Sequence, residues 1–462
     1  MKNLLTAILA TVVAAVSIQA KGPRKNTKPN VILMMADDLA YADLACYGNK
    51  ALKTPVLDQM AKEGIRLTSY YSGNTVCTPS RMALLTGAYP PRLGWQGGVV
   101  GYKIKGQNGL APEALTIAET FKEAGYRTAL VGKWHLGNTP ALQPMKQGFD
   151  EAYYIKMSNN QTDELWREDK LLEKPFENRL LSEKFANEAV TFIKNNKDKP
   201  FFLYLPWTAP HFPAQSHPEW KGKSKHSAFG DVVEELDARV GEVLQAVKDN
   251  KLDDNTLVIF TSDNGTDGSQ KKWGNRKPYR GMKWMTLEGG NRVPCIVRWP
   301  GVIPPEQTSG AIVGAIDLFP TIAAACNVEI KSKGIPKIDG LNCWPTLINS
   351  AKAHPRNDLL FFHGWGTMQA IRLGNHKLYV DKTKEIQGSQ KGPVLYDLST
   401  DPAESIDLAA KHPEIVAKLL TMAETKLTDV NANVINMGGP KPPNPKDNHG
   451  AWLKKGKGTD GE

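Results

Sequence analysis

The chain has 462 residues, of which 41% are hydrophobic and 23% are charged, a balance typical of a globular protein large enough for one big domain and a smaller one. With only 5 Cys it is not a disulfide-stapled miniprotein, and its 40 Gly and 31 Pro follow no collagen-like period. The formal net charge of +10 is modest, and no dense Lys/Arg block is present. Nucleic-acid binding is therefore not indicated, and an anionic substrate suits the charge equally well.

The amino terminus predicts a secretory signal. Met1–Ala20 opens with one Lys, continues as an apolar run from Leu4 to Ile18 and ends in a small residue. This is the pattern of a signal peptide cleaved after Ala20, and the run is short for a membrane anchor of about 20 residues. We therefore expect an exported protein, periplasmic or secreted, without a membrane span once the signal is removed.

Short apolar runs alternate with helical patterns along most of the chain. Runs typical of buried parallel strands lie at Val31–Met35, Thr128–Val131, Phe201–Leu205, Thr256–Phe260 and Cys295–Trp299. Helices are expected at Thr54–Glu63, Thr116–Ala124 and Asp231–Lys248. This alternation predicts an α/β fold, a three-layer α/β/α sandwich around a largely parallel mixed sheet.

The pattern changes after about residue 350. Gln369–Leu373 and Lys377–Val380 are short and strand-like, and Pro413 to Thr425 has the pattern of a helix with Pro in its first turn. We expect a catalytic domain over residues 21–350, a small C-terminal α+β subdomain over 351–437 and a loosely ordered tail over 438–462.

Acidic residues directly follow two of the predicted strands. Asp37 and Asp38 come after the first strand, and Asp263 and Asn264 come after the fourth. Ligands of open α/β sheets bind beyond the carboxyl ends of the strands, where these oxygen donors fit Ca²⁺ or Mg²⁺. Either pair alone is as readily a turn or a helix cap, but two such pairs favour a metal site.

Basic residues and one thiol lie in similar positions. Lys133, His135, His211 and Lys283 would suit a tetrahedral oxyanion beside a metal, although a structural or solvated role is the commoner one for each residue taken alone. Cys77 precedes a helical run. A thiol at a helix amino terminus has a lowered pKa and is nucleophilic, whereas a Cys buried in a tight turn is inert.

Motifs in a fixed order give a family resemblance. Residues 77–87, CTPSRMALLTG, hold every fixed position of C-x-P-S-R-x-x-x-L-T-G and resemble the signature of type I sulfatases. The other motifs of the family are matched in order by Asn30–Asp38 with Gly48, Gly132–Gly137, Pro210-His211 with Pro213, Thr261–Gly265, Arg280–Lys283, Glu288–Gly290, Arg292–Pro294, and Leu395–Leu398 with Asp401, Pro402 and Glu404. The resemblance extends over about residues 30 to 410.

The resemblance implies the alkaline-phosphatase-like fold and a sulfuric ester hydrolase. In such sulfatases the signature Cys, here Cys77, becomes Cα-formylglycine (3-oxoalanine), made by a formylglycine-generating or sulfatase-maturing enzyme that recognises Thr78–Arg81. A hydroxyl of the hydrated aldehyde then attacks the sulfur. One Ca²⁺ ion would be bound by Asp37, Asp38, Asp263 and Asn264. Arg81 would hold the formylglycine, Lys133 and Lys283 would bind sulfate, His135 would accept a proton from the diol, and His211 would bind substrate and protonate its leaving oxygen.

Three functions are compatible with these residues. The leading one is desulfation of a carbohydrate, such as a glycosaminoglycan or an algal polysaccharide fragment. The others are hydrolysis of phosphate or phosphonate esters and non-catalytic binding of sulfated glycans by a chain whose Cys77 stays unmodified. The complete set of ligands and proton carriers favours the first. Trp95, Trp284, Arg276 and the loop Gln215–His226 are candidate substrate contacts that packing or solvation explains as well, and no disulfide is expected among the other four cysteines.

Overall fold

The computed structural model describes residues 28–95, 97–101, 109–331, 337–349, 354–380, 392–432 and 434–435. The expected signal peptide (1–20) and tail (438–462) lie outside the described residues. Among the helices in the described ranges, none combines the length and apolar character that a membrane crossing requires.

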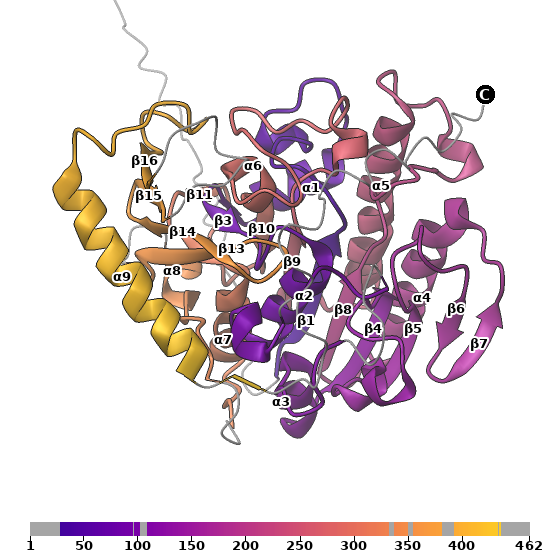
Figure 1. Ribbon diagram of the computed structural model, residues 1–462. Helices are drawn as coiled ribbons and strands as arrows, with labels where there is room; N and C mark the ends of the chain where they lie inside the picture. Colours follow the sequence, from indigo (N-terminus) through magenta and orange to yellow (C-terminus); the bar gives the residue numbers. More distant parts are fainter. Residues whose placement is uncertain are drawn as a thin grey trace, which may run out of the picture.

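A ten-stranded mixed sheet forms the middle of the molecule (Figure 1). Its strand order is β11-β2-β10-β9-β1-β8-β4-β5-β6-β7, and the central run β9-β1-β8-β4-β5 is parallel. The strands are β1 Asn30–Ala36, β2 Ile65–Leu67, β4 Arg127–Lys133, β5 Glu151–Ile155, β6 Leu165–Arg167, β7 Lys170–Glu173, β8 Phe201–Pro206, β9 Thr256–Ser262, β10 Cys295–Arg298 and β11 Gln307–Ser309. The predicted fold class is confirmed.

The direction predicted for Cys295–Trp299 is wrong. This segment forms β10, which runs antiparallel to both β9 and β2. The preceding helix α6 (Glu288–Asn291) lies near the carboxyl end of β9, where the backbone N–H of Gly265 donates to Gly290 O at 3.0 Å. The chain therefore enters β10 from that edge and runs back. A strand buried on both faces is equally apolar in either direction, so composition does not reveal this.

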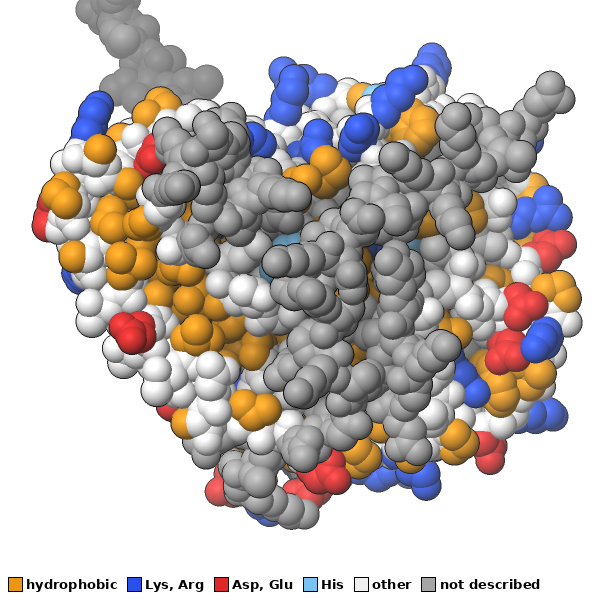
Figure 2. Space-filling model, in the orientation of Figure 1, with side chains coloured by type: hydrophobic (Ala, Val, Ile, Leu, Met, Phe, Trp, Pro, Cys, Tyr) orange, Lys and Arg blue, Asp and Glu red, His pale blue; other side chains and the backbone are white. Residues whose placement is uncertain are grey.

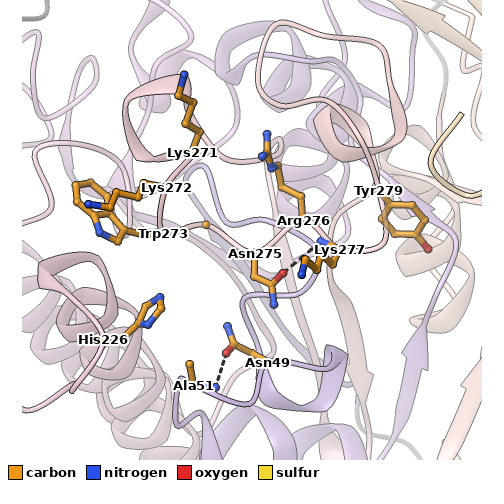
Figure 3. A pocket seen from close by; sticks show the side chains of 11 residues that line it. Asn49, Ala51, His226, Lys271, Lys272, Trp273, Asn275, Arg276, Lys277 and Tyr279 are labelled. Atoms are coloured by element: carbon orange, nitrogen blue, oxygen red, sulfur yellow. Dashed lines mark hydrogen bonds between the residues drawn. The ribbon is translucent and has the colours of Figure 1, made fainter. Parts of the chain in front are cut away.

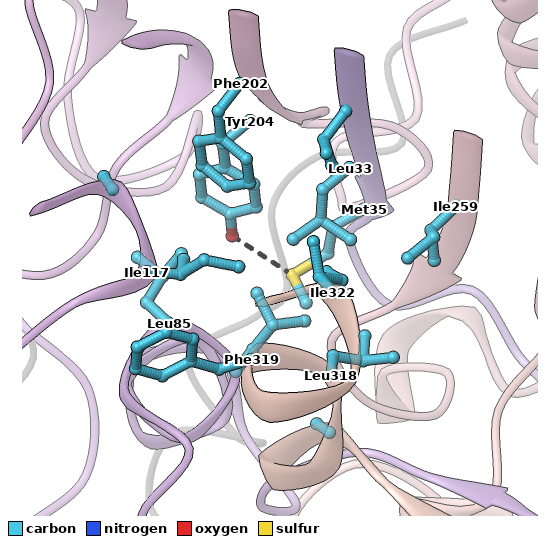
Figure 4. Packing of buried hydrophobic residues seen from close by; sticks show 14 of the residues in the cluster. Leu33, Met35, Leu85, Ile117, Phe202, Tyr204, Ile259, Leu318, Phe319 and Ile322 are labelled. Carbon is cyan, nitrogen blue, oxygen red and sulfur yellow. Dashed lines mark hydrogen bonds between the residues drawn. The ribbon is translucent and has the colours of Figure 1, made fainter. Parts of the chain in front are cut away.

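Helices cover both faces of the sheet, which makes three layers. One face is covered by α1 (Pro55–Lys62), α4 (Leu181–Asn195) and α5 (Ala228–Asp249), and the other by α2 (Cys77–Thr86), α3 (Ile117–Glu123), α7 (Ala315–Ala325) and α8 (Trp344–Ile348). Successive side chains of β1 alternate between these layers, because strand side chains point to opposite faces in turn. Leu33 and Met35 pack against Leu318 and Ile322 of α7 in Figure 4.

A second, four-stranded antiparallel sheet follows the large one. It consists of β13 (Asp358–Phe362), β14 (Met368–Leu373), β15 (His376–Tyr379) and β16 (Val394–Asp397), and it packs against the long helix α9 (Pro413–Ala432), drawn in yellow in Figure 1. Strands β3 (Tyr70–Tyr71) and β12 (Val313–Gly314) pair with each other in a separate two-stranded sheet. Helix α9 continues past the predicted end at Thr425, since Lys426 pairs with Asp358 at 2.9 Å and Val430 is buried.

A buried ion cluster joins this C-terminal subdomain to α6. Lys377 of β15 lies 2.9 Å from Glu288 Oε1 and 3.0 Å from Glu404 Oε1, and all three side chains are fully buried. Glu404 also accepts the backbone N–H of Glu288 at 2.7 Å, and Arg292 pairs with Glu288 at 3.1 Å. Because Lys377 and Arg292 outweigh burial, the pKa of Glu288 falls to about 2. Each buried charge therefore has an opposite charge beside it.

Removal of Lys377 is expected to destabilise the fold strongly. Lys377→Met leaves Glu288 and Glu404 buried side by side with less compensation, and breaking a buried pair costs about 3–5 kcal/mol. The half-exposed pair Lys184–Glu173 provides the control, since Lys184→Met should cost at most about 1 kcal/mol. Urea unfolding of both variants measures the difference. Equal, small losses would show that the cluster contributes nothing beyond a surface pair.

Candidate active site

Four adjacent strands deliver polar side chains to one edge of the sheet. Asp263 and Asn264 follow β9, Asp37 and Asp38 follow β1, His211 lies beyond β8, and β4 ends in Lys133 with His135 two residues on. The order β9-β1-β8-β4 makes these four carboxyl ends neighbours. All of these side chains are buried. The cluster expected from the sequence therefore exists.

Helix α2 places Cys77 and Arg81 in the same cluster. Cys77 is the first residue of α2, and its sulfur and one carboxylate oxygen each of Asp37 and Asp263 all lie within 4.8 Å of one another. Arg81, one turn further along, donates to Asp263 Oδ2 at 2.7 Å, and its NH2 lies 3.5 Å from Asp37 Oδ1. Its NH1 also donates to the carbonyl of Lys133 at 3.2 Å. Arg81 thus bridges the acids that follow β1 and β9.

Two lysines each pair with one carboxylate oxygen of the acids that follow β1. Lys133 Nζ lies 2.6 Å from Asp37 Oδ2, and Lys283 Nζ lies 2.8 Å from Asp38 Oδ2. Burial alone would raise the pKa of Asp37, but Lys133 and then Arg81 outweigh it and the pKa is lowered. Burial likewise works against the charge of Lys283, but Asp38 raises its pKa well above the usual value. Lys283 therefore remains charged.

The acids retain unused oxygen donors. Asn264 donates to Asp38 Oδ1 at 2.6 Å, and Asp263 Oδ1 accepts the backbone N–H of Asp38 at 3.1 Å. Asp37 Oδ1 and Asn264 Oδ1 are buried and accept no hydrogen bond from the described residues. Burial raises the pKa of Asp38 to about 8 despite Lys283. A hard divalent cation would satisfy these oxygens and supply the positive charge that keeps Asp38 ionised, so the donor set fits such a metal.

Tight backbone turns allow the convergence. Asp38 and His135 both have left-handed backbones, with φ of 67° and 58°, a conformation that costs non-glycine residues about 1–3 kcal/mol each and that gathers at functional sites. Near the end of β4, glycine is required at position 132 because a Cβ on Gly132 would overlap the carbonyl oxygen of Pro206. Gly265 is required in the same way against the carbonyl of Gly289. These contacts explain the glycines of two sequence motifs.

Hydrogen bonds assign the tautomers of the two histidines. His135 Nε2 lies 3.0 Å from the carbonyl of Val100, so Nε2 carries the proton and donates. His135 Nδ1 is then an acceptor, buried without a hydrogen-bond partner among the described residues. His211 Nδ1 donates to the carbonyl of Phe212 at 2.7 Å, and its Nε2 lies 3.5 Å from Asp38 Oδ2. Each ring thus keeps one nitrogen for chemistry.

Of the two alternatives that the sequence leaves open for Cys77, the structure favours the buried, inert thiol. Burial raises the pKa of the thiol although Lys133 and Lys283 oppose this, and Asp37 and Asp263 add to the rise. An unmodified Cys77 is therefore a poor nucleophile at neutral pH, since the thiolate is the reactive form. All five cysteines are free thiols.

The other candidate contacts separate in space. Trp284 packs beside Val76, Cys77 and Val99, and its ring centroid lies 5.5 Å from that of Trp365, which places it next to the site. Trp95 is buried and donates to Gly98 O. In the loop Gln215–His226, Lys223 lies over the Trp220 ring at 4.7 Å, and His226 lines a different pocket together with Arg276.

Three residues have supporting roles in the site that the sequence did not predict. Thr78 donates to His135 O at 2.9 Å and accepts from Val100 N at 3.0 Å, which fixes both sides of the His135 turn. Asp267 carries a negative charge close to Lys283 and His211, which lower its pKa against the effect of burial. Gln270 donates to Pro210 O at 2.7 Å, next to His211. Only Thr78 carried a signal, its place in the Cys77 motif.

Comparison with known proteins identifies the family. A sequence model of the family described as Sulfatase matches residues 29–328. Human N-acetylgalactosamine-6-sulfatase is 30% identical over 450 residues, covering 86% of this chain and 85% of that protein, and human arylsulfatase A is 34% identical over 444 residues, covering 85% and 86%. The crystal structure of Ps i-CgsB in complex with k-i-k-neocarrahexaose has a TM-score of 0.77 at 28% identity and covers 89% of this chain and 96% of that one.

The chain belongs to the sulfatase family and is a sulfuric ester hydrolase of the type I, alkaline-phosphatase-like class.

The raised pKa of Cys77 can be tested directly on protein in which this residue is unmodified. In protein made without maturation and kept in a chelator, native Cys77 should resist iodoacetamide at pH 7.5, because burial and raised pKa both suppress the thiolate. Peptide mass spectrometry after a timed pulse measures the label, and the buried core residue Cys295 is the control. Labelling of Cys77 at the rate of an unfolded chain would show that the site is open and the thiol activated.

Proposed function

We propose that the protein is an exported sulfatase that hydrolyses sulfate esters of a sulfated carbohydrate, using a formylglycine made from Cys77 and one Ca²⁺ ion. One observation carries this proposal. Three buried carboxylates and three buried cations gather with Cys77 at the carboxyl edge of the sheet, and two of the acceptor oxygens there have no hydrogen-bond partner among the described residues. Such a site holds a divalent cation and a tetrahedral oxyanion together.

The metal and the modified residue have distinct places in this cluster. Asp37, Asp38, Asp263 and Asn264 would hold the ion. When present, the formylglycine supplies an oxygen nucleophile and Ca²⁺ supplies Lewis acidity at the sulfate. Arg81 keeps Asp263 oriented through two hydrogen bonds to one oxygen, at 2.7 and 3.1 Å. Because Arg81 lies one turn after Cys77 in α2, it also keeps residue 77 beside the residues that would bind the metal.

The lysines are the sulfate-binding groups of the proposal. An ammonium has three N–H donors, and within the described residues Lys133 donates to one side-chain acceptor, Asp37. Lys283 similarly uses one donor on Asp38. Each lysine therefore has donors left for a sulfate oxygen. In a site closed to water, these charges stabilise the transition state far more than they would at a surface.

The histidines move the protons. His135 Nδ1 is the unprotonated nitrogen, so His135 accepts a proton at that atom from the hydroxyl at position 77. When both ring nitrogens of His211 are protonated, Nε2 donates its proton to the leaving alcohol oxygen, while Nδ1–H stays bound to Phe212 O and the ring is left neutral. Burial, followed by Lys283, lowers the pKa of His211, which makes its protonated form a stronger acid. The two histidines thus serve opposite ends of the reaction.

A carbohydrate substrate is supported by similar proteins. The name N-acetylgalactosamine-6-sulfatase specifies a sugar, and Ps i-CgsB was solved in complex with k-i-k-neocarrahexaose. The signal-like pattern of Met1–Ala20 supports export, and a maturing enzyme that recognises Thr78–Arg81 would be the partner that makes the formylglycine. The proposed boundaries remain a signal over 1–20, the catalytic domain over 21–350, the C-terminal subdomain over 351–437 and the tail over 438–462.

Calcium binding is expected to stabilise the fold through Asp263. A ligand that binds only the folded state at 100 times its Kd stabilises it by about 2.7 kcal/mol. Thermal unfolding with and without Ca²⁺ should show this shift in the wild type and lose it in Asp263→Asn, which removes one charge from the ligand set and abolishes activity. The matched control is Asp237→Asn, another buried carboxylate, which accepts the N–H groups of Val56 and Leu57 and should keep the shift. A full shift in Asp263→Asn would contradict the assignment.

The role of His211 can be separated from sulfate binding by the leaving group. A sugar alkoxide needs a proton to leave, and a general acid contributes about 10²–10⁴-fold, whereas nitrophenolate leaves without one. His211→Ala should therefore reduce sugar desulfation far more than hydrolysis of nitrophenyl sulfate. Lys133→Ala removes a charge from the sulfate itself and should reduce both. Rates on both substrates decide the point, and equal losses for His211→Ala would mean that His211 binds sulfate and is not the acid.

A further inference from the structure

A second pocket lies outside the residues of the candidate active site. Its volume is about 340 Å³, and it lies between the loop Lys271–Tyr279, the segment around Asn49 and Ala51, and His226 before α5. In Figure 3 the ring of His226 lies across from Trp273. Asn275 of the loop faces Asn49 of the opposite segment. None of these residues has a part in the reaction described above.

The pocket is strongly basic. Its loop carries Lys271, Lys272, Arg276 and Lys277, and none of the four forms a salt bridge within the described part of the chain. Asp43 is fully buried, and its two oxygens already accept the N–H groups of Asn275 and Ala40, at 2.6 and 2.7 Å. This acid therefore does little to oppose the binding of an anion in the pocket. Figure 2 shows Lys and Arg side chains gathered along the upper edge of the molecule. Such a surface attracts an anionic ligand.

Hydrogen bonds fix the walls of the pocket. Asp43 holds the loop through Asn275 N, and Ala42 N donates back to Asn275 O at 2.9 Å. The opposite wall is attached to the same residue, because Asn49 Nδ2 donates to Asp43 O at 3.2 Å. Arg276 NH1 is held by Gly281 O at 3.2 Å. A ligand would therefore meet a pre-organised surface, which reduces the entropic cost of binding.

The aromatic lining favours a saccharide over a simple ion. Trp273 is 37% exposed, unusual for so large an apolar side chain, and Tyr279 lines the opposite side of the pocket in Figure 3. An indole offers a flat apolar face to the C–H side of a sugar ring, while the nearby cations and the amide of Asn275 match sulfate and hydroxyl groups.

The pocket is connected to the active site through its own loop. The chain leaves Asn264, forms the pocket with residues 271–279 and returns to Lys283, whose N–H donates to Thr266 O at 3.0 Å. Near the start of the loop, Gln270 is bound to Pro210 O beside His211. The same loop therefore presents a sulfate-binding lysine at its base and the basic pocket at its tip.

We propose that this pocket is a second saccharide subsite, which binds a sulfated unit of the substrate other than the one being hydrolysed. The proposal rests on the proposed function, because it deepens the substrate class from a sulfated sugar to a chain bearing more than one sulfate. Lys272 and Lys277 would contact the sulfate and Trp273 would pack against the ring.

The test uses sucrose octasulfate as the probe, with sucrose as the uncharged match, in calorimetric titrations of the full protein. A hydrogen bond to a charged group contributes about 1.5–3 kcal/mol, so Lys272→Ser/Lys277→Ser should weaken binding about 10- to 100-fold. Trp273→Ser should also weaken it. The control is Lys197→Ser/Lys199→Ser, which removes two exposed charges before β8, at the other end of the strands. It should bind as the wild type does, and sucrose should not bind.

Three results would overturn the subsite. They are no binding by the wild type, an equal loss in the control variant, and equally tight binding of inositol hexaphosphate that Trp273→Ser leaves unchanged, which would mark a general polyanion surface. Hydrolysis of nitrophenyl sulfate by the same variants separates this proposal from the sulfatase assignment. Activity at the wild-type level with unchanged probe binding rejects the subsite alone, whereas an inactive, fully matured wild type rejects the proposed function.

Discussion

The structure depends on three carboxylates buried together at the carboxyl edge of the sheet. Asp37, Asp38 and Asp263 are fully excluded from water, and uncompensated charges there would cost several kcal/mol each. Arg81 is the central compensating group, since it contacts both Asp37 and Asp263 while being completely buried itself. Lys133 and Lys283 complete the balance, and a divalent cation would fit the oxygens that remain. Arg81 contacts Asp37 and Asp263, and Cys77 lies one turn before it in α2. The position of Arg81 therefore places Cys77 next to these acids.

The C-terminal subdomain stabilises the segment that leads to this site. Arg280 binds the carbonyls of Ala403 and Glu404, and Glu404 accepts the N–H of Glu288. Gly289 N donates to Arg280 O at 2.7 Å, and Gly290 O accepts from Gly265 next to Asn264. Lys283 lies within this stretch. The buried cluster around Lys377 therefore supports, through backbone hydrogen bonds, the segment that carries Lys283, the residue proposed to bind sulfate.

The sequence was most informative where pattern and position agree. Val31–Met35 and Thr256–Phe260 are apolar runs followed by acids, so both the strands and the polar edge could be predicted. Short, half-exposed strands such as β6 (Leu165–Arg167) carry no such pattern. The direction of β10 depends on where the preceding chain ends, and the pKa of Cys77 depends on burial by distant segments. The basic pocket joins Asn49, His226 and Lys277, which nothing local in the sequence brings together.

The most direct measurement correlates modification of residue 77 with turnover. Several preparations, made with different amounts of a maturing enzyme, would be analysed by peptide mass spectrometry for replacement of the CH₂SH side chain by CHO. Sulfate released from a sulfated sugar would be measured on the same samples. Specific activity should rise in proportion to the formylglycine fraction and extrapolate to zero at zero modification. Full activity in a preparation whose Cys77 peptide is entirely unmodified would contradict the proposed chemistry.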